Sequence, residues 1–429
     1  MKWQRVLGAV LTLFLVSMVA CTGDDNNGGG GGGKVTLDYW VFESGGLAGQ
    51  FLDQLQSDFE AKYPNVTLNI TAYPEDNYGV KLDTAIVAGK EPDLVLVFGP
   101  EQMRAGLLLP IDDVVTENNI DLSQYVPAIV QPGDEFSCNY EGKLYCLGSY
   151  AGSVQMLYNK DLFDAAGIPY PAAWPPMTPE QFIENACALT DAANGVWGGA
   201  ASDPLAYAPF DMMFSPDGKT ATGYSNGPDF VHQVEVLASG YERKCLPTSN
   251  VMDPWEQGRD YFAQGKLAMV ITDFQDLDKV ENAGINYGST AVPTPAGVEP
   301  YFFVWTDSVG VMASSDNPVE AKEFIAFLTT EGETIRYEAS GDMPLNLQTA
   351  QDVNWANGVP GREDGLEVLA HARPLVFVPN RWDVVGPYYD AWDLVLGGDK
   401  TAQEAMDDAT PAIQDNLDNA WQDWEEGAP

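Results

Sequence analysis

The stretch that decides the fold runs from Gly142 to Phe182 and reads GKLYCLGSYAGSVQMLYNKDLFDAAGIPYPAAWPPMTPEQF. Residues Val154 to Tyr158 alternate with the period of a β-strand, so successive side chains are expected to point to opposite faces. Asn159 follows as a helix N-cap, and Gly167 is expected to end the short helix that Asn159 opens. The TPEQ motif at 178–181 is a capping box with proline at the first helical position, which predicts a second helix.

An earlier, shorter strand ends at Leu147 and is followed by a tyrosine between two nearby glycines. Gly148 and Gly152 lack a Cβ atom and therefore allow close backbone approach around Tyr150. The order is thus strand, glycine-flanked aromatic residue, strand and two capped helices, without a long linker. This order, together with the motifs GKLY and LYNKDLFDAAGIPYP and a tryptophan-containing turn, resembles the family 1 extracellular solute-binding proteins, which serve sugar-importing ABC transporters.

The same resemblance extends over most of the chain. It includes YPNV at 63–66, the stretch from Lys81 to Val95, Leu-Pro-Ile at 109–111 and YFAQGKLAM at 261–269. It implies an α/β protein with the two-lobed periplasmic-binding-protein type II fold, three hinge crossings and an inter-lobe cleft. The implied lobes are 34–150 with 304–343, and 151–303 with 344–429.

The residues of the first lobe themselves predict a parallel sheet. Alternation over 35–39 and 66–70 predicts two strands, and the continuous apolar run at 93–98 predicts a strand that is covered on both faces. Repeated strand–helix–strand units give parallel pairing with right-handed crossovers. Ligands of such sheets bind outside the carboxyl ends of the strands. Those ends carry Trp40, Phe42, Glu43 and Phe98.

A sugar site needs aromatic platforms for C–H faces and paired polar groups for hydroxyls. The strand ends and the implied crossings supply the candidates. They are Trp40, Glu43, Phe98, Tyr150, Asp273, Phe274, Trp305, Asp307, Arg381 and Trp382. Each aromatic residue is equally compatible with core packing, the two aspartates with helix capping, and the Arg381–Trp382 pair with a surface loop. Gly152 departs from relatives that have a carboxylate there, so the resemblance does not identify the sugar.

The chain carries 63 acidic and 21 basic residues, a formal net charge of −42. A surface of this kind repels nucleic acid and anionic lipid, which argues against binding to either. Two interpretations of the acidity remain open. One is a cationic ligand, and the other is a solvated surface suited to high salt or to a monomeric protein.

Residues 1–20 have the three parts of a secretory signal. After a basic start, the apolar run Val6–Val19 is short for a membrane span, and Ala20 stands directly before Cys21. We expect cleavage there and lipidation of Cys21, as in a bacterial lipoprotein, so that the mature protein is anchored to the cell membrane at the cell surface or in the periplasm. The glycine-rich segment 21–33 then serves as a flexible tether. The alternative is an ordinary signal with an incidental cysteine.

Four cysteines remain after Cys21, and an even number in an exported protein favours disulfides. Cys138 and Cys146 flank a tight turn and are expected to pair across it, which leaves Cys187 with Cys245. Four cysteines permit three connectivities, of which this one is favoured. No Cys-x-x-Cys occurs, so neither a zinc site nor thioredoxin-like redox chemistry is indicated.

Catalytic motifs give little support to an enzyme. The chain has two histidines, His232 and His371, and no His-Glu-x-x-His metal motif. Residues 223–227 fit Gly-x-Ser-x-Gly, but the apolar strand that a nucleophile elbow requires does not precede them, so we interpret them as a turn. The glycines at 28–33 are not a phosphate loop, because no Gly-Lys-Ser/Thr follows.

These observations predict a lipid-anchored monomer that binds a mono- or oligosaccharide without cofactor or metal and delivers it to the permease subunits of an ABC importer. One alternative is a binding protein for a non-sugar solute, such as a polyamine, a polyol phosphate or an iron chelate. The other is a secreted glycoside hydrolase, since paired carboxylates are compatible with so acidic a chain.

Overall fold

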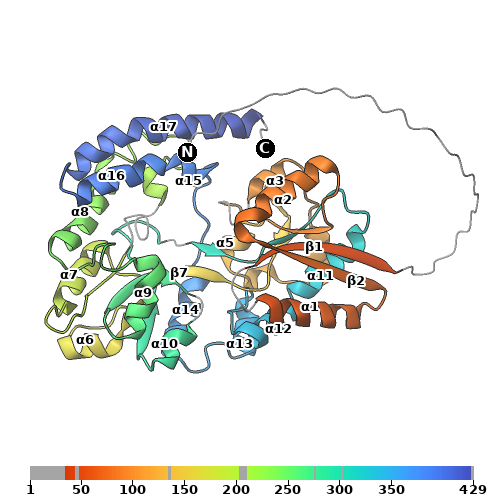
Figure 1. Ribbon diagram of the computed structural model, residues 1–429, viewed down its shortest axis with the longest axis horizontal. Helices are drawn as coiled ribbons and strands as arrows, with labels where there is room; N and C mark the ends of the chain where they lie inside the picture. Colours follow the sequence, from red (N-terminus) through yellow and green to blue (C-terminus); the bar gives the residue numbers. More distant parts are fainter. Residues whose placement is uncertain are drawn as a thin grey trace, which may run out of the picture.

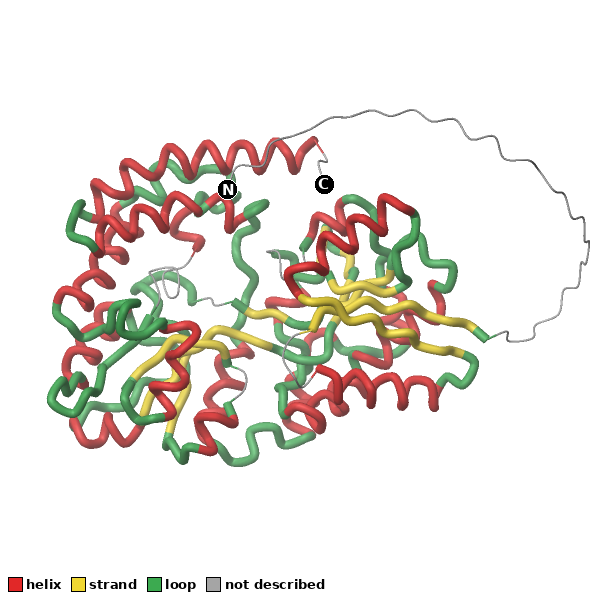
Figure 2. The backbone as a smooth tube through the Cα atoms, in the orientation of Figure 1, coloured by secondary structure: helices red, strands yellow, loops and turns green. Residues whose placement is uncertain are grey.

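The computed structural model describes residues 34–43, 48–97, 99–133, 137–201, 210–274, 277–300 and 303–426. Two lobes lie side by side, each built around its own sheet (Figures 1 and 2). The expected signal segment, lipidated Cys21 with its tether, and Phe98 lie outside the described residues, and Glu43 is described by its backbone alone.

The first lobe contains a five-stranded sheet in the order β2-β1-β3-β11-β6. β1 pairs in parallel with β2 and β3, as the strand–helix–strand pattern predicts, whereas β11 runs antiparallel to β3 and β6. The strands are β1 (Val35–Glu43), β2 (Val66–Pro74), β3 (Leu94–Leu96), β6 (Cys146–Leu147) and β11 (Val309–Val311).

Helices cover both faces of this sheet, with α1 and α11 on one face and α2 on the other (Figure 1). The interior is apolar, and Leu37, Leu55 and Phe324 are fully buried in it. The helices of this lobe are α1 (Ala48–Lys62), α2 (Glu75–Ala88), α3 (Pro100–Arg104), α4 (Asp112–Glu117), α5 (Pro127–Val130), α11 (Pro318–Leu328) and α12 (Glu331–Ser340), with the 3₁₀ turn η1 (Leu122–Gln124).

The sheet of the second lobe is built on β7 (Gly152–Asn159), whose side chains are buried along its whole length. β8 (Met269–Asp273), β9 (Tyr287–Thr290) and β10 (Val304–Trp305) all pair with it antiparallel. The helices of this lobe are α6 (Lys160–Ala166), α7 (Pro179–Leu189), α8 (Pro228–Glu242), α9 (Pro254–Ala263), α10 (Asp278–Asn282), α14 (Pro360–Ala370), α15 (Arg381–Val384), α16 (Gly386–Leu396) and α17 (Ala402–Glu426), with the 3₁₀ helix η3 (Phe210–Met213).

The structure confirms the elements predicted for the stretch that follows Gly142. The side chain of Asn159 accepts hydrogen bonds from the backbone N–H groups at the start of α6, and α6 ends at Gly167 with a φ of 68°. Thr178 and Gln181 form the reciprocal capping box of α7. The Gly-x-Ser-x-Gly segment is a turn, and its Ser225 is buried beside the hydroxyl of Thr410 at 2.8 Å.

Both expected disulfides are present. Cys138 and Cys146 join with a Cα–Cα distance of 5.0 Å and close the hairpin of β4 (Asn139–Tyr140) and β5 (Lys143–Leu144). Cys187 and Cys245 join at 4.6 Å and tie α7 to the segment just after α8. The first bridge thus fastens the chain immediately before it leaves the first lobe.

Three described segments carry the chain between the lobes. Residues 148–151 connect β6 to β7, and residues 306–308 connect β10 to β11. Residues 341–359, which include α13 (Leu347–Asp352), lead from α12 to α14. The division into lobes at 150, 303 and 343 remains a prediction. It assigns residues 304 and 305 to the first lobe, and these residues form β10, which pairs with the sheet of the second lobe. Across the described ranges, no helix combines the length and apolarity needed to cross a membrane.

Candidate ligand-binding site

A buried tyrosine in the core of the first lobe hydrogen-bonds to the carboxyl end of β1. The hydroxyl of the fully buried Tyr78 donates to the carbonyl oxygen of Trp40 at 3.1 Å and accepts from the backbone N–H of Leu96 at 2.9 Å. The half-buried ring of Trp40 packs edge-on against Tyr73, with 5.0 Å between ring centroids. Burial raises the pKa of Tyr78, so its hydroxyl keeps its proton and remains available for the bond to Trp40.

Two aromatic rings meet where the first two crossings lie side by side. Trp305 pairs through its backbone with Gly152 at the start of β7, and its side chain is close enough to Tyr150 to lower the pKa of that phenol against the larger effect of burial, which raises it. The ring of Tyr150 lies 4.3 Å from the guanidinium carbon of Arg336. Both residues are partly exposed, as residues of an aromatic platform for a ligand need to be.

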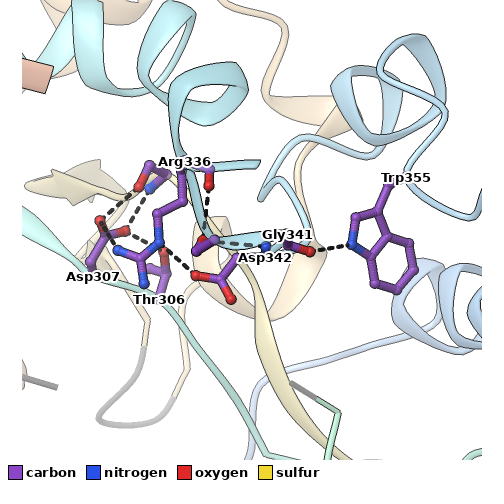
Figure 3. A network of polar contacts seen from close by, with 8 residues as sticks. Thr306, Asp307, Arg336, Gly341, Asp342 and Trp355 are labelled. Carbon is purple, nitrogen blue, oxygen red and sulfur yellow. Dashed lines mark hydrogen bonds and ion pairs between the residues drawn. The ribbon is translucent and has the colours of Figure 1, made fainter. Parts of the chain in front are cut away.

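Asp307 is turned into the protein and is satisfied there (Figure 3). Its carboxylate accepts from the backbone N–H of Ser149 at 2.6 Å and from the hydroxyl of the same residue at 2.7 Å. Arg336 lies 3.9 Å from it and pairs more closely with Asp342, at 2.6 Å. Burial raises the pKa of Asp307, while the nearby guanidinium lowers it. The carboxylate of Asp307 therefore links the crossing at 148–151 to the crossing at 306–308. Its predicted contact with the ligand would come in addition to these bonds.

In the second lobe, Asp273 and Phe274 stand at the end of β8. Asp273 lies 3.4 Å from the guanidinium of Arg259, whereas Phe274 is buried at 2% exposure. The ring of Phe274 packs against Trp355, with centroids 5.9 Å apart, and fills the space above Gly365, where an added Cβ would overlap it. The structure thus places Phe274 in the core of the lobe.

Arg381 and Trp382 follow one another at the start of α15 but face different surroundings. Arg381 is 2% exposed and donates to the carbonyl oxygen of Val376. Trp382 is 50% exposed, and its ring packs against Phe303 with centroids 5.6 Å apart. Trp382 is therefore the exposed member of this pair, and Arg381 is the buried one.

Two of the predicted site residues, Trp305 and Phe274, contact the start of β7, next to Phe303. The carbonyl oxygen of Phe303 accepts from the N–H of Val154 at 3.0 Å, and the carbonyl oxygen of Ser153 accepts from the N–H of Phe274 at 2.7 Å. Trp305 lies beside the same residues through its pairing with Gly152. Trp40 belongs to the other sheet and contacts Tyr73 there.

A family model for the bacterial extracellular solute-binding proteins matches residues 44–335. The chain belongs to this family. A putative binding protein of Brucella abortus is 24% identical over 405 residues, which are 88% of this chain and 94% of that protein. The galactooligosaccharide-binding protein of Bacillus subtilis is 25% identical over 347 residues, 77% of this chain and 78% of that one.

Solved structures of solute-binding proteins share the fold. The sugar-binding protein MalE from Xanthomonas citri superposes with a TM-score of 0.75 at 16% identity, over 92% of this chain and all of that one (100%). An ABC substrate-binding protein from Listeria monocytogenes in complex with cycloalternan gives 0.70 at 24% identity, over 90% and 99% of the two chains. The predicted two-lobed α/β fold of a periplasmic binding protein is thereby confirmed.

The sequence analysis did not identify the residues of this solute-binding protein that form the polar network around Asp307. Arg336 and Asp342, which Figure 3 labels, and Ser149, which donates to Asp307, are not among the predicted ligand contacts. One signal pointed to Arg336, because it is the single basic residue in the acidic segment 331–342. No group of His, Cys, Asp or Glu side chains in the described residues is arranged to hold a metal ion.

Proposed function

We propose that this solute-binding protein captures a mono- or oligosaccharide outside the cytoplasm and presents it to the permease subunits of an ABC importer. The observation that carries the proposal is the gathering of Tyr150, Trp305 and Trp382 around the start of β7, next to two crossings. Aromatic faces bind the apolar C–H faces of sugars with little loss of side-chain entropy. The family and the galactooligosaccharide-binding relative support the same assignment.

Capture requires that the ligand contact both lobes across a cleft. A ligand held by Trp40 and Glu43 on one side and by Asp273 and Trp382 on the other has its highest affinity for the arrangement with the lobes close together. It therefore shifts the population toward that arrangement, which is the form that a permease can distinguish. The remaining predicted contacts stay in the proposed set, and no catalytic step is proposed.

The test is isothermal titration calorimetry on the polypeptide that begins at Lys34, with neutral mono- and oligosaccharides and, separately, polyamines. We expect binding of one sugar molecule per chain, and chromatography of the recovered sugar should show it unchanged. Binding heat with polyamines but with none of the sugars would overturn the sugar assignment and favour a cationic ligand for this acidic chain. Shortened sugar products would instead reveal a glycoside hydrolase.

The proposed lipid anchor at Cys21 has a test of its own. In cells that process bacterial lipoproteins, we expect the full chain to fractionate with membranes and Cys21→Ser to fractionate with the soluble exported proteins. Mass spectrometry of the mature N-terminus should find a diacylglyceryl group on Cys21. A mature chain that begins elsewhere and is soluble without the substitution would show an ordinary secretory signal.

A further inference from the structure

One arginine lies where all three crossings come together. Arg336, in the middle of α12, points toward Asp307 and Asp342 (Figure 3), and its guanidinium also lies beside the ring of Tyr150. Each of these three residues belongs to a different passage between the lobes. A single side chain therefore contacts every described connection between them.

Its polar contacts form a continuous chain of bonds. Nε of Arg336 pairs with Asp342 at 2.6 Å, and Nη1 lies 3.9 Å from a carboxylate oxygen of Asp307. Asp307 in turn accepts the two hydrogen bonds from Ser149 at 2.6 and 2.7 Å. All three charged side chains are at most 14% exposed, so water screens these interactions little.

The same guanidinium lies over two aromatic rings. Its central carbon lies 4.3 Å from the centroid of Tyr150 and 4.7 Å from that of Phe51 in α1. A planar guanidinium can stack on rings while its fork of N–H groups donates to carboxylates, whereas the compact ammonium of lysine has no planar face to stack and offers fewer donors. Arg336 is thus positioned to fix the plane of Tyr150 relative to the crossings.

We propose that Arg336 is a positioning residue that couples the three crossings to the ring of Tyr150, so that the geometry of the lobes and the ligand platform change together. The inference rests on the proposed function insofar as Tyr150 contacts the sugar. A buried ion cluster adds little to stability by itself, because desolvation offsets the attraction between the charges. Fixing one arrangement of mobile segments is a use for which such a cluster is suited.

The first test is a double-mutant cycle on sugar affinity, with the oligosaccharide that binds best in calorimetry. We expect Arg336→Lys to weaken binding about tenfold, within the range of coupling energies between residues in contact. In a Tyr150→Leu background the same substitution should have little further effect. The matched control is Arg362→Lys, because Arg362 is also largely shielded from solvent, pairs with Glu281 at 2.7 Å and lies over the ring of Trp355, but contacts the third crossing alone. Equal affinity losses in both lysine variants, or independent effects of Arg336 and Tyr150, would overturn the coupling.

The second test needs no sugar. Amide hydrogen exchange should accelerate in Arg336→Lys at residues 148–151, 306–308 and 341–343 together, whereas Arg362→Lys, which contacts only the third crossing, should leave 148–151 and 306–308 unchanged. Acceleration confined to α12 would show that Arg336 acts only within its own helix. If Arg336→Lys does not fold, Asp342→Asn replaces it, because it removes one charge of the cluster and keeps the guanidinium. Should no sugar bind, the proposed function fails, while the exchange pattern still decides whether Arg336 joins the crossings.

Discussion

Trp305 is the residue whose removal tests the platform most simply. Trp305 is partly exposed and lies close to Tyr150, so Trp305→Ala should remove contact area with the sugar and leave the core intact. We expect a loss of about 2 kcal/mol in binding, about thirtyfold in affinity, from the apolar area lost. Calorimetry with the best-binding sugar measures it. Trp421→Ala is the control, since that indole is anchored on α17 by the carbonyl oxygen of Gly218. Equal affinities for the wild type and Trp305→Ala would remove Trp305 from the site.

Glu333 gives the protein a testable pH dependence. It is fully buried in α12, and burial followed by the nearby charge of Asp307 raises its pKa well above the usual 4.5, although bonds from Thr349 and Asn346 lower it. The folded state therefore holds this proton more tightly than the unfolded chain. The corresponding stability is fully present below pH 4.5 and is lost as the pH rises through the raised folded-state pKa.

We expect Glu333→Gln to flatten the fall in stability above pH 4.5 and to be more stable than the wild type at neutral pH. Urea unfolding at several pH values measures the free energy of unfolding of both proteins. Glu338→Gln, exposed on the same helix, controls for the general benefit of removing one negative charge from an acidic chain. The same slope in the wild type and Glu333→Gln would mean that Glu333 does not titrate in this way.

At the scale of single elements, the cap of α7 contributes to stability through local bonds. Thr178 accepts from the N–H of Gln181, whose side chain returns a bond to the N–H of Thr178. Thr178→Ala should lower the free energy of unfolding by about 1 kcal/mol, as expected for the loss of an N-cap hydroxyl. Chemical denaturation measures the change. Thr84→Ala in α2, where the hydroxyl is exposed, is the control, and equal effects would refute the role of the cap.

Local signals explain which elements could be predicted from the sequence. Asn159, Gly167 and the capping box of α7 act on their own neighbours, so a few adjacent residues determine the outcome. The pairing of Cys138 with Cys146 could be predicted for the same reason, because only 8 positions separate the two cysteines. The alternation of side chains along 154–158 also predicted β7, but it did not predict which three strands pair with it.

The arrangement of the site depended on contacts that no local pattern specifies. Ser149 and Asp307 are separated by 158 positions, and nothing near either residue indicates that they pair. Phe274 stays a predicted ligand contact from its place at a strand end, but that place did not indicate its 2% exposure or its packing against Trp355. A strand end places a residue near the edge of its sheet. Whether its side chain is exposed to solvent depends on the helices that pack on that sheet.

At the scale of the molecule, the lobes touch away from the crossings as well. The last turns of α17, a helix packed on α8 and α16 of the second lobe, reach over the first lobe (Figures 1 and 2). There Trp424 lies 4.5 Å from the guanidinium of Arg104 in α3 and 6.2 Å from the ring of Tyr140. A second contact joins Gly133 to Pro374, where an added Cβ would come within 1.9 Å of the proline ring.

We expect Trp424→Ala to widen the range of distances between the lobes, because it removes a contact that limits their relative motion. Small-angle scattering should show a broader pair-distance distribution than in the wild type. Trp421→Ala, three residues earlier on the same helix and packed on Phe377, should leave the distribution unchanged. An unchanged distribution in Trp424→Ala would mean that the crossings alone determine how the lobes are arranged.

The measurement that tests capture between the lobes most directly is small-angle scattering of the wild-type protein with and without saturating sugar. We expect the radius of gyration to fall when the best-binding oligosaccharide is added, because a ligand that contacts both lobes favours the arrangement with the lobes close together. In Trp305→Ala the same fall should require a higher sugar concentration. Stoichiometric binding with no change in the radius of gyration would contradict capture between the lobes.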